Sequence, residues 1–336
     1  MYEQKPWLKF YGGIPERIDY PRVTMYEALM QTVSRCPEVV AYDFFGTTST
    51  YRQFGGQIDR CADALAALGL KKGDRITISM PTCPQGIICF YAANKLGAVA
   101  SMIHPLSPAK EIEFYLQTAK SRMALTLDAF YGKFKEVQEK TGLQTLILAR
   151  IPDYLGFAKR IGFNLTKGRK IKPVPPDPLV RWWSDLMKGG TPPAPKADMG
   201  PDEMAVILFS GGTTGVPKGI MLSNTNFISE GMQVAAWGSM GGGDSMLAIL
   251  PIFHGFGLGV CINAVFMGGG KSILVPQFTP EIVADLIKKK RPSLVVGVPT
   301  LFEALASHPV FRKADLGCLK ATFCGADTLP RPVKER

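Results

Sequence analysis

Apolar residues recur along the chain in short blocks whose spacing alternates between that of a helix and that of a strand. A first amphipathic helix is predicted over residues 25–33. After it, helices and strands are predicted in alternation over 51–68, 75–80, 84–96, 98–103, 109–119, 123–127, 129–140 and 145–148. Because strands that alternate with helices form parallel sheets with helices on their faces, this part predicts an α/β unit.

A second block with the same alternation follows. Strands are predicted at 205–209, 220–222, 246–250, 272–275, 294–298 and 318–324, and helices at 226–237, 258–266, 280–289 and 300–306. The two blocks share an order of elements but no repeated sequence. We therefore expect an α/β fold of two doubly wound, mostly parallel sheet subdomains packed together, residues 1–200 and 201–336.

Between the two blocks, residues 150–199 form a basic, proline-rich excursion. The whole chain has 39 Lys and Arg against 28 Asp and Glu, a net charge of +11. Residues 150–188 hold nine of the basic side chains and three acids, so +6 lies there and +5 in the other 297 residues. Apolar residues among these charges fit either a solvated surface excursion or a segment at a membrane surface. No nucleic-acid motif accompanies the charge, so we expect no nucleic-acid partner.

The cysteines and the N-terminus favour a reducing compartment. The seven cysteines show no C-x-x-C and no zinc-type spacing with histidine, so we expect no metal site. The first residues lack the apolar core of a signal peptide. We expect a cytoplasmic protein, with peripheral contact at the inner membrane face as a further option.

One uncharged stretch, residues 245–270, is long enough to span a bilayer. Pro251, His254, Asn263 and several glycines interrupt it. We therefore predict a buried strand, a loop and a buried helix there.

The most informative segment is 210–219, Ser-Gly-Gly-Thr-Thr-Gly-Val-Pro-Lys-Gly. Its glycines let backbone N–H groups converge on an anion, while its hydroxyls and Lys218 add donors and positive charge. The Gly-Lys-Ser/Thr ending of a Walker loop is absent, and so is Gly-x-Gly-x-x-Gly spacing. The sequence therefore predicts a phosphate-binding loop of another kind, between two strands.

This loop resembles the phosphate-binding signature of the adenylate-forming superfamily, and four further segments match that superfamily in the expected order. They are Thr-Tyr-Arg-Gln-Phe at 50–54, Lys-Leu-Gly-Ala-Val through His-Pro at 95–105, Leu-Pro-Ile-Phe-His-Gly-Phe-Gly at 250–257 and Cys-Gly-Ala-Asp-Thr-Leu at 324–329. Within the superfamily the chain resembles the acyl-CoA synthetases, in particular the long-chain fatty-acid–CoA ligases. Two positions depart from the common pattern, because Asn224 replaces a histidine and Cys324 replaces a glycine.

The resemblance implies a reaction and a set of site residues. Members make acyl-AMP and pyrophosphate from a carboxylate and ATP, and CoA then displaces AMP. The residues implied to hold the phosphates are Ser210, Gly211, Gly212, Thr213, Thr214, Gly215 and Lys218. Those implied to border the adenine are Gly325, Ala326 and Asp327. The implied catalytic residues are His254 and Lys218.

The resemblance also implies a pocket for the acyl group, shaped by Phe253, Phe256, Gly257 and Gly325, although plain core packing stays open for the two phenylalanines. Amino-acid adenylation domains usually carry an Asp just after the Pro-x-Phe element, whereas this chain has no acid between His254 and Lys271. An uncharged wall suits an alkyl chain, so we expect a medium- or long-chain fatty acid. The alternatives are an amino-acid or aryl-acid adenylation domain and a non-catalytic fragment that binds nucleotide or lipid. Thr300 begins a predicted helix and either caps it or faces the ligand, and we favour the cap.

Family members also carry a Tyr-Gly-x-Thr-Glu element, whose Glu helps bind Mg²⁺, and a mobile C-terminal domain with a catalytic lysine. The 336 residues contain no Tyr-Gly-x-Thr-Glu. We therefore expect the N-terminal portion of an enzyme that uses ATP, Mg²⁺ and CoA, the last two largely through parts outside this chain. Alone, it is expected to fold and to bind nucleotide weakly, without turning over.

Overall fold

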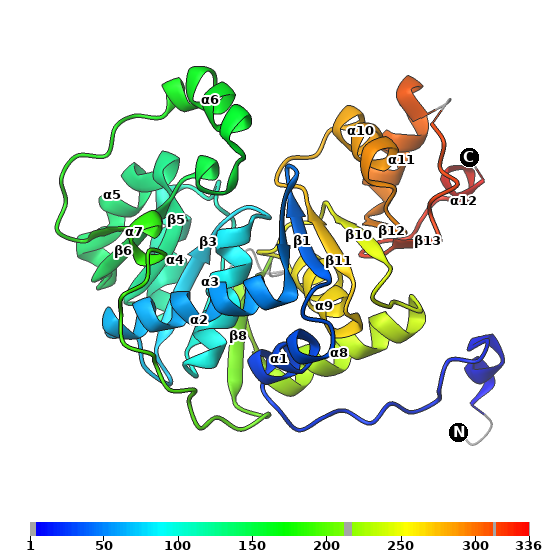
Figure 1. Cartoon of the computed structure of the whole chain (residues 1–336), viewed down its shortest axis with the longest axis horizontal. Coiled ribbons are helices and arrows are strands. Elements are labelled where there is room, and N and C mark those ends of the chain that lie inside the picture. The colour runs from blue at the N-terminus through cyan, green and yellow to red at the C-terminus, as the bar shows by residue number, and fades with distance from the viewer. Residues whose placement is uncertain (1–4, 212–216, 312–313, 336) are drawn as a thin grey trace.

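The computed structural model describes residues 5–211, 217–311 and 314–335, which form two sheets surrounded and separated by helices (Figure 1). The seven-stranded sheet has the spatial order β7 (Val180–Trp182), β6 (Thr145–Ala149), β5 (Met123–Leu127), β3 (Arg75–Ser79), β4 (Val99–Met102), β8 (Met204–Ser210) and β9 (Lys218–Ser223). The six-stranded sheet has the order β13 (Ala321–Cys324), β12 (Leu294–Gly297), β10 (Ser245–Ala248), β11 (Lys271–Leu274), β1 (Val40–Phe44) and β2 (Thr47–Thr50).

The longer helices follow the predicted alternation, except for the helix over Phe157–Leu165, which lies in the basic excursion where no helix was predicted. They are α1 (Met25–Arg35), α2 (Tyr51–Ala67), α3 (Pro84–Lys95), α4 (Ala109–Ala119), α5 (Tyr131–Thr141), α6 (Phe157–Leu165), α8 (Asn224–Trp237), α10 (Pro280–Lys290) and α11 (Pro299–Ser307). Short α-helical turns are α7 (Trp183–Leu186), α9 (Val265–Gly268) and α12 (Arg331–Lys334). Single 3-10 turns are η1 (Pro6–Phe10), η2 (Asp128–Phe130), η3 (Ile151–Tyr154), η4 (Gly168–Lys170) and η6 (Pro309–Phe311).

Each sheet is parallel except for one antiparallel hairpin at its edge, β8–β9 in the larger sheet and β1–β2 in the smaller. This confirms the predicted fold class. The sheets do not, however, divide the chain at residue 200. The early hairpin β1–β2 joins the six-stranded sheet through β11, and the later hairpin β8–β9 joins the seven-stranded sheet through β4. The expected 1–200 and 201–336 division therefore does not coincide with the division between the sheets.

The β1–β2 hairpin is an element that the sequence pattern did not predict. Its two-residue turn, Phe45 and Gly46, has positive φ at both positions (53° and 93°), as a tight hairpin turn requires. The Asp43 carboxylate accepts a 2.8 Å hydrogen bond from the Gly46 N–H and so supports the turn. Because each strand is only four or five residues long, its alternation gives a weak signal.

Helix α3 lies at the centre of the molecule, and all twelve of its residues are buried. One side packs on β3 and β4, and other sides meet α1 and α2. Facing the six-stranded sheet, the Tyr91 hydroxyl donates to Asn263 (3.1 Å), which in turn donates to the Phe227 carbonyl (2.6 Å). A helix that is apolar on all sides has to be covered on all sides, so α3 holds the two sheets together.

The segment that carries Asn263 differs from the expected α-helix over 258–266. Residues Gly257–Ala264 form a π-helical segment, η5, which continues into α9. Together with β10 these elements account for the uncharged stretch. Among the described residues, no helix is long and apolar enough to cross a membrane.

The basic excursion is only partly a surface feature. Its β7 pairs with β6 at the edge of the seven-stranded sheet, and the adjacent Trp183 is fully buried. Helix α6, in contrast, stands at the outside of the molecule (Figure 1). Thr300 is not the cap expected from the sequence, because Val298 is the N-cap of α11 and Thr300 lies exposed in its first turn.

The start of α8 is joined to α1 and α3 by a buried polar cluster. The Asn224 side-chain oxygen accepts hydrogen bonds from the Met25 N–H (3.0 Å) and the Asn94 amide (2.8 Å). The Asn94 oxygen accepts in turn from the Tyr26 N–H (2.8 Å). Asn224 is fully buried, so its hydrogen-bond partners cannot bond to water instead when its side chain is removed.

We predict that Asn224→Ala lowers the free energy of unfolding by about 2–4 kcal/mol, because two buried donors lose their acceptor. Urea unfolding followed by circular dichroism measures the change. Asn164→Ala, on the exposed helix α6, is the control and should cost less than about 0.5 kcal/mol. Equal losses for the two variants would contradict this role of Asn224.

Candidate active site

The predicted phosphate loop connects the two strands of the β8–β9 hairpin. Ser210 and Lys218 are the last residues to pair across the hairpin, so their backbones are fixed side by side where the loop begins and ends. Both are exposed, and so is Gly211. Four of the expected phosphate-binding residues, Gly212, Thr213, Thr214 and Gly215, lie outside the described residues.

The other predicted motifs follow the carboxyl ends of neighbouring parallel strands, the edge where α/β sheets bind ligands. His104 follows β4, and Phe253 and His254 follow β10. The His104 and Phe253 rings lie 4.3 Å apart. The Thr82 hydroxyl, after β3, donates to the Leu250 carbonyl, after β10, at 3.2 Å. These contacts bring the carboxyl ends of the two sheets together.

The two histidines of this edge differ in surroundings. His104 receives a 2.9 Å hydrogen bond on Nδ1 from the Leu106 N–H, and burial lowers its pKa below the ordinary value. His254 is exposed, and its Nδ1 accepts from the Phe256 N–H at 3.4 Å. The Nδ1 contact orients the His254 ring beside Phe256. The predicted catalytic histidine is thus next in sequence to Gly255 and in contact with Phe256, which both line the apolar cavity described next.

An apolar cavity of about 300 Å³ lies behind the β8–β9 hairpin. Leu208 and Leu222 of the hairpin form one wall, and Phe256 forms part of another. Of the pocket residues expected from the sequence, Phe256 lines this cavity and Gly325 packs against its ring, where an added Cβ would lie 3.0 Å from Cζ. The hairpin therefore carries both the predicted phosphate loop and a wall of the cavity.

Two other expected pocket residues have different places. Phe253 packs on His104 and is not among the described residues that line the cavity. Gly257 begins η5, where a Cβ would lie 2.1 Å from the Pro251 carbonyl oxygen. Its role is close backbone packing, which no larger residue permits.

The third wall of the cavity contains an acid that the sequence reasoning missed. Helix α8 places Phe227 and, three residues later, Glu230 on the same face. One Glu230 carboxylate oxygen is buried without a hydrogen-bond partner. Burial raises the pKa of Glu230 to about 7. The stretch after His254 is uncharged as expected, but the helix that faces it is not. The three-residue spacing between Phe227 and Glu230 places both on one helix face, and this was the sequence signal that could have revealed the acid.

The predicted adenine-side residues follow β13. The Gly325 N–H donates to the Gly297 carbonyl (3.2 Å), which fixes the start of this segment against β12. Ala326 has a φ of 72°, in the left-handed region, and both Ala326 and Asp327 are exposed. The Asp327 carboxylate accepts from the Thr328 N–H at 2.7 Å. The turn thus presents an exposed edge beside Phe256.

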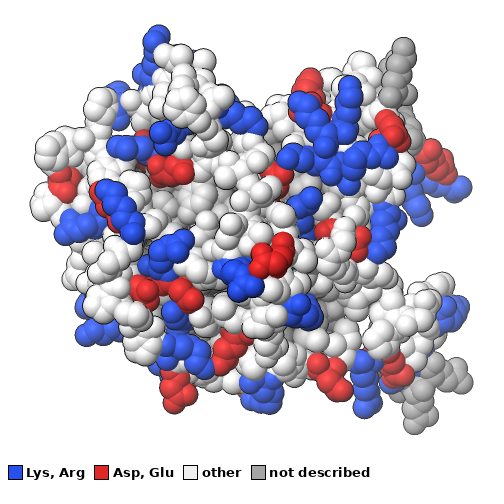
Figure 2. All heavy atoms as spheres, viewed as in Figure 1, with Lys and Arg blue, Asp and Glu red and all other residues white. Residues whose placement is uncertain are grey.

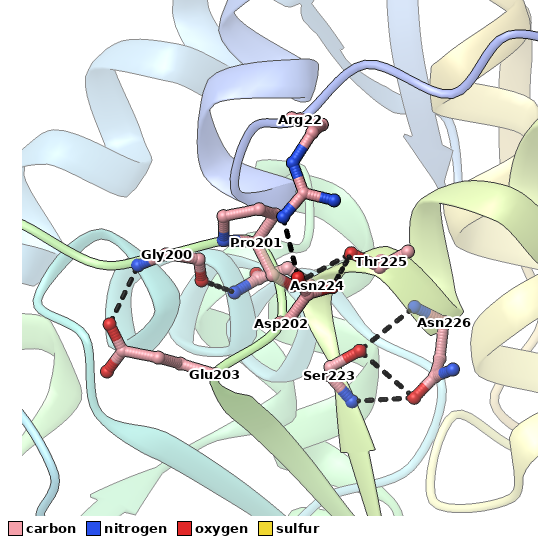
Figure 3. Close-up of polar contacts among 9 residues, drawn as sticks. All are labelled: Arg22, Gly200, Pro201, Asp202, Glu203, Ser223, Asn224, Thr225 and Asn226. Carbon is pink, nitrogen blue, oxygen red and sulfur yellow. Dashed lines mark hydrogen bonds and ion pairs between the residues drawn. The ribbon is translucent and has the colours of Figure 1, made fainter.

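The departure at Asn224 lies at the other end of the hairpin. Figure 3 shows this end, where Ser223 and Asn226 cap α8 and Asn224 points toward the Gly200 carbonyl. Arg22, Asp202 and Thr225 form a neighbouring chain of contacts, 2.7 Å and 2.8 Å long. Ser223 lies five residue steps of extended strand from Lys218, which is roughly 17 Å. The substitution therefore affects helix packing, well away from the phosphate loop.

Comparison with known proteins decides the family. The family model described as AMP-binding enzyme matches residues 29–336. The chain belongs to the AMP-binding enzyme family. A long-chain-fatty-acid–CoA ligase of Bacillus subtilis is 31% identical over 343 residues, covering 100% of this chain and 61% of the relative. A 4-coumarate–CoA ligase of Oryza sativa is 26% identical, covering 86% of this chain and 50% of the relative. The chain thus spans about three fifths or less of the length of these AMP-binding relatives.

Solved structures show the same fold. A long-chain-fatty-acid–CoA ligase from Archaeoglobus fulgidus matches with a TM-score of 0.80 at 20% identity, covering 95% of this chain and 60% of that one. ATP-bound MatB from Rhodopseudomonas palustris matches with a TM-score of 0.78 at 22% identity, covering 94% and 57%. The two-sheet core is therefore the N-terminal fold of AMP-binding enzymes.

Glu230 makes stability depend on pH. Its folded-state pKa of about 7 exceeds the ordinary value of 4.5, so between these values the folded protein keeps a proton that the unfolded chain releases. We predict that the free energy of unfolding falls by up to roughly 3 kcal/mol as the pH rises from 4.5 to 7, and then levels off.

The measurement is the difference in unfolding free energy between wild type and Glu230→Gln across this range. The difference should change with pH, because glutamine does not titrate. Glu139→Gln, at an exposed position on α5, is the control and should run parallel to wild type. A Glu230→Gln profile that is also parallel to wild type would show that this carboxyl is not held protonated.

Proposed function

We propose that this chain is part of an acyl-CoA synthetase that adenylates a medium- or long-chain fatty acid with ATP, before thioester formation with CoA. The observation that carries the proposal is the double role of the β8–β9 hairpin. One end presents Ser210 and Lys218 at the phosphate loop, and its Leu208 and Leu222 form a wall of the apolar cavity. The relatives named as long-chain-fatty-acid–CoA ligases support the same substrate class.

The proposed roles divide the site into three parts. Ser210, Gly211, Gly212, Thr213, Thr214, Gly215 and Lys218 hold the β- and γ-phosphates. Gly325, Ala326 and Asp327 border the adenine. His254 stands between the nucleotide and the cavity, and Phe256 lines the acyl side. Phe253 packs against His104 and supports the site from there.

The chemistry requires two anions to meet. A carboxylate oxygen forms a bond to the α-phosphorus, and the bond to the bridging oxygen breaks, so that pyrophosphate leaves with the electron pair. Lys218 and the loop N–H groups stabilise the charge that develops on the leaving group. His254 donates to a carboxylate or phosphate oxygen and fixes the two reactants within reach.

Cofactors other than ATP are proposed from the family resemblance alone. Among the described residues, no group of three or more His, Cys, Asp or Glu is placed to hold a metal ion. Mg²⁺ normally uses one or two carboxylates together with the phosphates of the nucleotide, so we assign no step to it here. CoA is proposed as the thiol substrate of the whole enzyme.

An aryl acid is the second candidate substrate. The cavity of about 300 Å³ is at the lower end of the range for ligand sites, and a compact ring fits such a volume. The 4-coumarate–CoA ligase among the relatives supports this alternative. A panel of alkyl and aryl acids, scored by pyrophosphate release from the longest natural form of the protein, separates the two.

We also propose a cytoplasmic protein that touches a membrane surface through α6. Phe157, Ile161 and Leu165 lie at every fourth position of this helix and are 75%, 45% and 55% exposed. The opposite side of α6, with Phe163, faces a cleft of about 1260 Å³ that α10 also lines. Lys and Arg side chains gather over α10 (Figure 2), where Lys288, Lys289 and Lys290 form its last turn. An apolar stripe near basic residues is typical of peripheral membrane contact.

For the phosphate site, we predict that Lys218→Ala weakens ATP binding about tenfold to a hundredfold, because a charge-assisted hydrogen bond is lost. Titration calorimetry with the 336-residue chain measures it. Lys188→Ala removes an exposed lysine of a surface ion pair and is the matched control. Unchanged ATP affinity in Lys218→Ala would reject the proposed phosphate site. We expect no fatty-acid-dependent pyrophosphate exchange from this chain alone, since its relatives are much longer.

For the membrane contact, we predict that the combined Phe157→Ser, Ile161→Ser and Leu165→Ser variant loses at least half of its co-sedimentation with anionic vesicles. Point substitutions are preferable to deleting the excursion, because a deletion also removes β7 and the buried Trp183. Val310→Ser with Leu316→Ser, at other exposed apolar positions, is the control. Equal sedimentation of the two variants would reject a specific role for α6.

A further inference from the structure

The most unusual feature of the apolar cavity is the carboxyl group of Glu230. The rest of the cavity is lined by aliphatic and aromatic side chains, glycine and the edge of Asn226. One carboxylate oxygen is buried and has no hydrogen-bond partner among the described residues. A buried polar group without a partner is costly, so its retention needs an explanation that helix packing does not supply.

The surrounding backbone makes room for this carboxyl group. A Cβ on Gly259 of η5 would lie 2.7 Å from one Glu230 oxygen and 2.8 Å from the other. Only glycine therefore lets the carboxyl group lie flat against η5. An alanine at position 259 would push the group away from its present place.

The neighbouring titratable groups do not neutralise Glu230. Tyr91 of α3 and Cys261 of η5 are the groups that interact with it electrostatically. Burial raises the pKa of Cys261 to about 12 and that of Tyr91 above its ordinary value, so both are uncharged near neutral pH. Among the described residues, no cation contributes to the raised pKa of Glu230, whose cause is burial. The carboxyl group is thus available to a ligand.

We propose that Glu230 selects an acyl substrate that carries a hydroxyl group remote from its carboxylate, and that the hydroxyl pairs with Glu230 inside the cavity. This inference rests on the proposed function, because it takes the cavity to be the acyl site. Glu230 acts as a specificity-determining residue and takes no part in the transfer to phosphorus.

The chemistry of the site favours a hydroxyl over other groups. A hydroxyl donates to a carboxylate and accepts from a protonated carboxyl, so it pairs with Glu230 on both sides of its titration. A plain alkyl end leaves the carboxyl group without a hydrogen-bond partner and also shields it from water, which lowers the affinity for the plain acid. An ammonium has three donors, and the one carboxyl group in an otherwise apolar cavity leaves donors unpaired.

The test is displacement of a fluorescent fatty acid from the 336-residue chain by matched pairs of competitors. The pairs are octanoic, decanoic and dodecanoic acids and their ω-hydroxy counterparts. In wild type, the ω-hydroxy acid of at least one length should bind about tenfold more tightly than its partner. In Glu230→Leu, the ω-hydroxy acid and the plain acid of each pair should bind with about equal affinity. Glu139→Leu, at an exposed position on α5, is the matched control and should keep the wild-type preference.

A second pair of variants keeps the result independent of folding defects. Glu230→Gln retains a donor and an acceptor, so it should keep most of the preference while removing its pH dependence. In wild type, the plain acids should bind more weakly as the pH rises through 7, because the alkyl end then covers a charge, whereas the ω-hydroxy acids should change less. Gly259→Ala should reduce the preference although the carboxyl group remains.

The outcomes separate the two proposals. Binding of both members of every pair with equal affinity in wild type would overturn the role of Glu230 and leave the acyl site standing. A preference that survives Glu230→Leu would also overturn it. Failure of all six acids to displace the probe from wild type would reject the cavity as the acyl site, and with it this inference.

Discussion

Helix α3 is buried along its whole length, and the two sheets are arranged around it. A helix with no side toward solvent needs a layer on every face. Here the seven-stranded sheet, α1 and α2 pack on α3, and its Asn94 and Tyr91 side chains contact α8 and η5. Since η5 and α9 in turn lie on the six-stranded sheet, α3 sets the separation of the two sheets. Hydrogen bonds from Tyr91 and Asn94 fix its rotation, because each must meet a partner on another helix.

The position of the site follows from this packing. The parallel strands of both sheets end at the same edge of the molecule, as the contacts Thr82–Leu250 and His104–Phe253 show. A loop that follows any of these strands is therefore close to loops from the other sheet. The β8–β9 hairpin places the predicted phosphate loop at this edge, and η5 and α8 enclose an apolar cavity directly behind the hairpin. The proposed phosphate site and the apolar cavity thus adjoin without any long connecting segment.

The sequence predicted the local elements well and their assembly less well. The bounds of α4 and β5 agree with prediction because their periodicity is strong and their ends are marked by turns. The β1–β2 hairpin was missed, since strands of four or five residues carry little periodic signal. Which sheet a strand joins depends on contacts between residues far apart in the sequence, which local periodicity does not reveal. The predicted division at residue 200 therefore does not describe the two sheets.

Glu230 was overlooked because the absence of acid was judged along one segment, while the cavity is built from two facing helices. The N-cap of α11 was predicted at Thr300, two residues after the observed N-cap Val298, because the Val-Pro-Thr sequence does not fix the residue at which the helix begins.

We propose that the loop of the β8–β9 hairpin and the apolar cavity are two halves of one binding site. The most direct measurement is the affinity of the 336-residue chain for a non-hydrolysable acyl-adenylate analogue, compared with AMP and with the free fatty acid. We predict that the analogue binds more tightly than either part and is displaced by both ATP and the fatty acid. Displacement by ATP alone, with the acyl chain adding nothing to affinity, would contradict it.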